Sequence, residues 1–79
     1  MIMRLLSQKQ CESILGARIT SLIEDGYRVV LRVQLANVWV ISLRHQAKRK
    51  FILIKYWPVT QRMEQWTDGN LMYSGIVTG

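Results

Sequence analysis

The sequence predicts an α+β fold in which one N-terminal amphipathic helix packs on an antiparallel β-meander of three strands. Two observations lead to this prediction. Apolar residues recur at helical spacing over residues 11–23, whereas apolar and polar residues alternate over much of residues 27–57. We expect a C-terminal hairpin to extend the sheet to four or five strands. The chain has 79 residues, which is room for a single domain, residues 1–79, with a thin core.

The helix is predicted to begin after Ser7 and to end at Asp25. The Ser7 hydroxyl can accept a hydrogen bond from a backbone N–H three residues on, and Gln10 stands where a capping box has Glu or Gln. Gly26 can take the left-handed conformation that is common just after a helix. Arg18 lies at the edge of the apolar stripe, where it either reaches water or contacts an anion or an acidic partner. The stripe itself consists of Cys11, Ile14, Leu15, Ile19, Leu22 and Ile23.

Three strands are predicted, at residues 27–33, 38–45 and 51–57. A short, strongly basic hairpin loop, residues 46–50, joins the second strand to the third, and Pro58 ends the third strand. On each strand one side is apolar or aromatic, and the other side carries the cations. The apolar side is expected to pack on the helix, with Ile14, Leu15, Leu22 and Ile23 against Val29, Leu31, Ile41 and Ile54.

The pattern is weaker after Pro58. Residues 59–66 fit either a strand or one to two turns of helix. Asp68-Gly69 is typical of a tight turn, and residues 71–77 read as a strand. These features predict the C-terminal hairpin.

The charge distribution indicates a binding surface. The net charge is +6, with 11 Lys and Arg against five Asp and Glu, and residues 27–62 contain no acidic residue at all. Such a stretch predicts a positive face for an anionic partner, although a solvated face that only keeps the protein soluble has the same composition. The candidate binding residues are Arg28, Arg32, Arg44, Lys48, Arg49, Lys50, Lys55 and Trp57.

We interpret these residues as a surface for nucleic acid. Single strands are held by cations that follow the phosphates and by aromatic side chains on which bases stack. The alternation places Phe51 and Trp57 on the cationic sheet face, and the loop of residues 46–50 adds a basic projection. This face also carries apolar residues and should not be left wholly in water. We expect the C-terminal hairpin, or a second copy of the chain in a homodimer, to cover part of it.

The alternative is a protein-binding module whose basic face docks on an acidic protein partner. Inhibitors, adaptors and dimeric regulators of this kind, such as phages and mobile elements encode, are often compact and free of motifs. The single cysteine, Cys11, excludes an internal disulfide and is typical of an intracellular protein. Residues 1–6 are too short for a signal peptide, and no apolar run approaches the roughly 20 residues of a spanning helix. We expect a cytoplasmic protein without a membrane partner.

The sequence predicts no catalytic residue, no cofactor site and no metal site. Cys11 and His45 are the only residues of their kinds, and their positions do not match any metal-ligand spacing. There is no glycine-rich phosphate loop and no nucleophile elbow. His45, beside Arg44 and the basic loop, could act as a general base in metal-free RNA cleavage. A structural or exposed histidine is the better interpretation, so we predict a small basic binding module that is not an enzyme.

Overall fold

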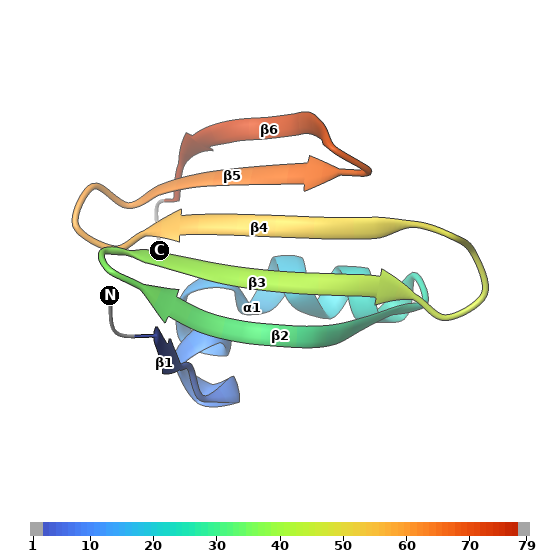
Figure 1. Cartoon of the computed structure of the whole chain (residues 1–79), viewed down its shortest axis with the longest axis horizontal. Coiled ribbons are helices and arrows are strands. Elements are labelled where there is room, and N and C mark those ends of the chain that lie inside the picture. The colour runs from blue at the N-terminus through green and yellow to red at the C-terminus, as the bar shows by residue number, and fades with distance from the viewer. Residues whose placement is uncertain (1–2, 78–79) are drawn as a thin grey trace.

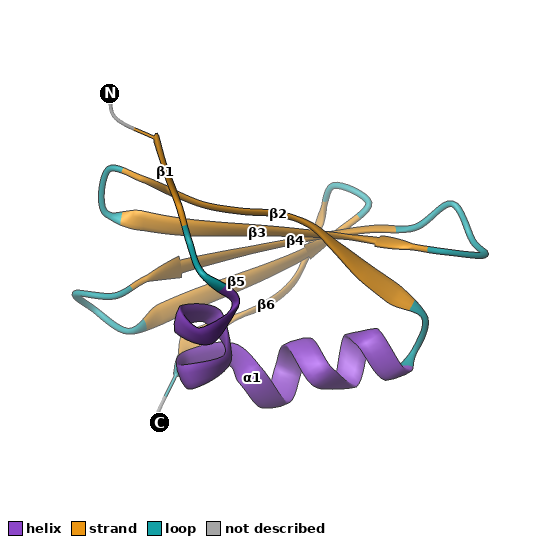
Figure 2. Ribbon diagram, turned by 90° about the horizontal axis from the view of Figure 1, so that it is seen from below, coloured by secondary structure: helices purple, strands orange, loops and turns teal. Residues whose placement is uncertain are grey.

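The computed structural model describes residues 3–77. Within them, one helix lies against a six-stranded antiparallel sheet whose strand order follows the chain, β1-β2-β3-β4-β5-β6 (Figure 1). The elements are β1 (Met3–Leu5), α1 (Gln8–Glu24), β2 (Tyr27–Leu35), β3 (Val38–His45), β4 (Phe51–Trp57), β5 (Arg62–Thr67) and β6 (Asn70–Ile76). The helix covers one face of the sheet, and no other described helix or strand forms a layer on the opposite face (Figure 2), where neighbouring side chains bury Val33 and Ser42. We call this second face the open face.

The predicted α+β class is confirmed, but the predicted number of strands is too low. The C-terminal hairpin β5–β6 extends the sheet from β4 as expected. Residues 62–66, for which the sequence allowed either a strand or a helix, belong to strand β5. The strand that was not predicted is β1, which pairs with the last residues of β2. Its three residues are too few for an alternation to be visible in the sequence.

The helix begins with the predicted capping box. The Ser7 Oγ accepts a hydrogen bond from the Gln10 N–H (3.1 Å), and the Ser7 N–H donates to Oε1 of Gln10 (2.9 Å). Ile23 was predicted to belong to the buried stripe, but its side chain is 51% exposed. The buried helix residues are Cys11, Leu15 and Ile19, while Ile14 and Leu22 are partly buried beside them.

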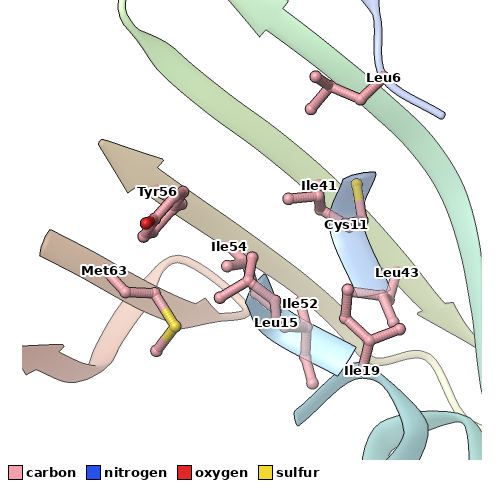
Figure 3. Packing of buried hydrophobic residues seen from close by; sticks show 10 residues of the cluster. All are labelled: Leu6, Cys11, Leu15, Ile19, Ile41, Leu43, Ile52, Ile54, Tyr56 and Met63. Carbon is pink, nitrogen blue, oxygen red and sulfur yellow. The ribbon is translucent and has the colours of Figure 1, made fainter. Parts of the chain in front are cut away.

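The core fills the space between α1 and the sheet (Figure 3). Its sheet residues come mainly from the two central strands, and β5 adds Met63. Ile41 and Ile54 are fully buried, in agreement with the alternation in β3 and β4. The cluster consists of Leu6, Cys11, Leu15, Ile19, Ile41, Leu43, Ile52, Ile54, Tyr56 and Met63.

A β-bulge at Val30 reverses the alternation halfway along β2. Val29 lies opposite Leu43, but Leu31 lies opposite Ser42, so one extra residue is inserted between them. Because side chains alternate with a period of two, everything after the bulge changes face. Leu31, which was predicted to pack on the helix, therefore lies on the open face and is 41% exposed.

Candidate functional site

The structure divides the eight predicted binding residues among three places. The cross-strand register puts Arg28, Arg44, Lys55 and Trp57 on the open face. Lys48, Arg49 and Lys50 are exposed in the loop between β3 and β4. Arg32 alone lies on the helix side of the sheet.

The prediction that Arg32 shares a face with Arg28 is wrong because of the bulge at Val30. Arg32 lies opposite Ile41, whose side chain belongs to the core beneath the helix. It lines the groove between α1 and β2 together with Cys11. Arg32 therefore cannot contribute to a ligand site on the open face.

Two arginines face each other at one end of the open face. Arg28 is the direct cross-strand partner of Arg44, and Arg44 is in turn the partner of Phe51. Directly opposite side chains have Cβ atoms about 4.5–5.5 Å apart, and like charges at this spacing are destabilising. The only ion pair of the described residues is Arg62–Glu64, so neither arginine has a carboxylate within 4.0 Å. Within residues 3–77, neither arginine is part of an ion pair.

The basic loop lies at the same end of the sheet as this arginine pair (Figure 1). It begins directly after β3, whose last residues are Arg44 and His45, and it ends at the first residue of β4, Phe51. The loop cations and the facing arginines together form what we call the basic end: Arg28, Arg44, Lys48, Arg49 and Lys50.

His45 holds the start of this loop against the end of the helix. Its Nδ1 accepts hydrogen bonds from the N–H groups of Ala47 and Lys48, both at 3.0 Å. Its Nε2 lies 3.0 Å from the carbonyl oxygen of Asp25, the C-cap of α1. The neutral ring with its proton on Nε2 satisfies all three bonds, and we assign this tautomer from the bonding pattern. Both ring nitrogens serve main-chain groups, which favours a structural role over general-base catalysis.

Lys55 belongs to a compensated cluster rather than to the basic end. It lies opposite Glu64, which also approaches Arg62 at 3.7 Å. The Lys55 Nζ is 5.8 Å from the centre of the Trp66 ring, and Trp66 Nε1 donates to Oε1 of Glu64 at 3.3 Å. The sequence around Lys55 has no acid, but β5 brings one alongside. Glu64 therefore offsets part of the positive charge of Lys55 and Arg62.

Phe51, and not Trp57, is the aromatic residue of β4 that lies at the basic end. Trp57 is at the other end of β4, about 20 Å from Phe51 at the ordinary rise of a strand. Sequence reasoning missed Trp66 because residues 59–66 fitted a helix as well as a strand. Phe51 and Trp66 instead contribute to a shallow pocket of about 190 Å³, lined by Phe51, Leu53, Lys55, Trp66 and Gly69, which we call the aromatic pocket.

Arg18 is used within the fold. Its Nη1 donates to Oε1 of Gln65 at 2.9 Å, and its guanidinium lies 4.7 Å from the centre of the Tyr73 ring. These contacts join α1 to β5 and β6. Arg18 was expected either to reach water or to contact an anion or an acidic partner. In the structure its side chain instead packs on the sheet of its own chain.

Neither a metal-binding cluster nor a membrane-spanning helix is present in residues 3–77. No group of three or more His, Cys, Asp or Glu side chains is placed to hold a metal ion there. No helix in this part of the chain is long and apolar enough to cross a membrane. No protein-family model, curated protein or solved structure matches the chain.

Proposed function

We propose that the protein is a small, cytoplasmic, non-enzymatic module that binds nucleic acid at the basic end of its sheet. The observation that carries this proposal is the facing pair Arg28 and Arg44, which has no carboxylate in reach. Such a pair costs free energy in the isolated protein. A phosphate between the two guanidinium groups would offset this cost with charge-assisted hydrogen bonds.

The surroundings of the arginine pair support a polyanion rather than a single small anion. Lys48, Arg49 and Lys50 extend the positive surface beyond the sheet, and all three are exposed. His45 orders the backbone that carries them. Phe51, the cross-strand neighbour of Arg44, is 38% exposed and offers an aromatic surface beside the cations. Cations that track phosphates next to aromatic side chains are the usual composition of a nucleic-acid surface.

The test is the salt dependence of binding, measured by fluorescence anisotropy with labelled single-stranded and duplex oligonucleotides. Each neutralised phosphate contributes about 0.7–0.9 to the log–log slope, so five cations predict a slope of about −3.5 to −4.5. The double variant Arg28→Gln/Arg44→Gln should flatten this slope by about 1.4–1.8.

Arg62→Gln is the matched control for net charge. It removes one cation from the same face, but one whose charge Glu64 already balances. It should leave the slope almost unchanged. The proposal is refuted if no oligonucleotide binds below millimolar concentration at low salt, or if Arg62→Gln flattens the slope as much as Arg44→Gln does.

An acidic protein partner remains the alternative occupant, because the same cations would steer its association. Copurification from the native host with and without nuclease separates the two. Nucleic acid that is recovered with the wild type but not with Arg28→Gln/Arg44→Gln supports our proposal. A stoichiometric acidic protein that survives nuclease treatment supports the alternative.

A further inference from the structure

The aromatic pocket adjoins the basic end through Phe51. Phe51 forms one wall and Trp66 another, with Leu53 between them. Leu53 is the direct cross-strand partner of Trp66, and Phe51 lies two residues before Leu53 on the same face. Phe51 and Trp66 are therefore diagonal neighbours on adjacent strands.

This diagonal relation brings two aromatic side chains to one pocket. Diagonal residues on adjacent strands are about 7–8 Å apart, which is within reach of aromatic side chains. Within the described residues, neither side chain stacks on another aromatic ring. The pocket that they line has a volume of about 190 Å³, below the roughly 300–1,000 Å³ of sites for drug-sized ligands, so its size suits a single planar ring system.

Existing contacts order the Trp66 side chain and the main chain of Phe51. The indole N–H of Trp66 is bonded to Glu64, and Lys55 lies over its ring. The main chain of Phe51 is bonded twice to Asp68: its N–H donates to Oδ1, and its carbonyl oxygen accepts from the Asp68 N–H, both at 2.9 Å. Groups that are already ordered in the free protein lose little conformational entropy when a ligand binds.

Resting on the proposed function, we infer that the aromatic pocket receives one unpaired base of a nucleic acid whose phosphates lie on the basic end. Arg44, the cross-strand partner of Phe51, places a phosphate-binding group next to the pocket wall. A base within a duplex is already stacked and paired, and must leave the helix before it can enter such a pocket. The module therefore selects single-stranded over duplex nucleic acid, and the shared chemistry is an unpaired base in DNA or RNA.

The experiment compares dissociation constants at one salt concentration for three probes: a pyrimidine oligonucleotide, its duplex, and an abasic strand of the same length. The abasic strand keeps the phosphates and lacks the bases. The wild type should bind the ordinary single strand about 5- to 150-fold more tightly than the abasic strand, which is the range of one stacked base. A preference for the single strand in either the DNA or the RNA series supports the inference.

Three variants locate the effect. Phe51→Ala and Trp66→Ala should lose the discrimination between ordinary and abasic strands, whereas Trp57→Ala, on the same face but away from the pocket, should keep it. Phe51 is partly exposed, so its replacement should leave the fold intact. As a second readout, the variant Trp39→Phe/Trp57→Phe retains Trp66 as its only tryptophan. Its fluorescence should be quenched by the ordinary strand and not by the abasic strand.

Equal affinity for ordinary and abasic strands would overturn the inference, as would a loss in Trp57→Ala equal to that in Trp66→Ala. In either case, a salt slope that still depends on Arg28 and Arg44 would leave the proposed function standing. Failure of every probe to bind would instead refute both.

Discussion

The attachment of the basic loop to the helix depends on Gly26. This residue has φ +105°, a conformation that side chains other than glycine rarely adopt. A Cβ atom there would lie 2.7 Å from Nε2 of His45. Gly26→Ala should therefore strain the backbone and also displace the imidazole that bonds Asp25, Ala47 and Lys48.

Gly69 supplies a matched control, because it also has positive φ (+84°) but nothing lies within 4 Å of an added Cβ. Backbone strain alone should cost each alanine variant about 1–2 kcal/mol. At Gly26 the loss of the His45 bonds adds to this strain. These bonds are exposed, so we take the lower part of the usual range and add about 1–2 kcal/mol for the three together. The expected cost is about 2–4 kcal/mol for Gly26→Ala and about 1–2 kcal/mol for Gly69→Ala.

Urea denaturation followed by circular dichroism measures both costs. Amide hydrogen exchange supplies the local readout: the N–H groups of Ala47 and Lys48 should lose protection in Gly26→Ala and keep it in Gly69→Ala. Equal free-energy costs, with unchanged exchange at both amides, would show that His45 does not hold the loop.

Three further predictions concern the core and the sheet edge. Leu15 is buried, so Leu15→Ala should lower the free energy of unfolding in urea by about 2–5 kcal/mol, whereas Ile23→Ala, at an exposed position, should lower it by less than about 1 kcal/mol. Equal losses of stability would contradict the observed orientation of the helix. Burial raises the pKa of the Cys11 thiol, so native protein should resist alkylation. The associated stability should be complete below the ordinary thiol pKa of about 8.5 and fall as pH rises toward the folded-state value, an effect absent in Cys11→Ala. The edge strand β6 has no charged residue, so its unpaired main-chain groups can pair with the same strand of a second copy. Sedimentation should therefore detect a concentration-dependent dimer that Met72→Lys abolishes. A wild type that stays monomeric at every concentration would refute this.

Much of the fold follows from local sequence signals. Ser7 and Gln10 form the capping box that their spacing predicts. The alternation in β3 and β4 correctly assigns Ile41 and Ile54 to the core and Lys55 to the open face. Each of these features is determined locally. The capping box is a pair of hydrogen bonds between residues three positions apart, and the face of a residue in a regular strand follows from the period of two.

The features that sequence reasoning missed depend on pairing between distant residues. The bulge at Val30 leaves no mark in a run of apolar residues, yet it moves Leu31 and Arg32 to the opposite faces. The predicted helix stripe includes Ile23, whose side chain is 51% exposed, whereas Cys11, Leu15 and Ile19 are buried. Either the C-terminal hairpin or a second copy of the chain is expected to cover part of the cationic face. The hairpin pairs with β4 as part of the sheet and does not cover it (Figure 1), while cover by a second copy stays a prediction.

Cross-strand pairing also explains why the proposed site lies at one end of the open face. Lys55 and Arg62 both have Glu64 as a neighbour, whereas Arg44 has Arg28. A sheet selected only for stability would place an acid at position 44, as it does at position 64. Unfavourable local choices that persist in a folded chain are expected at functional sites.

This difference predicts opposite effects for two charge reversals. Arg44→Glu should raise stability by about 0.5–1 kcal/mol, because it replaces a repelling cross-strand pair with an attractive one, and it should weaken nucleic-acid binding. Arg62→Glu should lower stability by a similar amount, because it places two carboxylates together, and it should affect binding less. Both stability effects should shrink in high salt, where exposed charges are screened. If Arg44→Glu proved no more stable than the wild type in low-salt urea denaturation, the facing arginines would carry no cost. Their pairing would then be no reason to expect a phosphate between them.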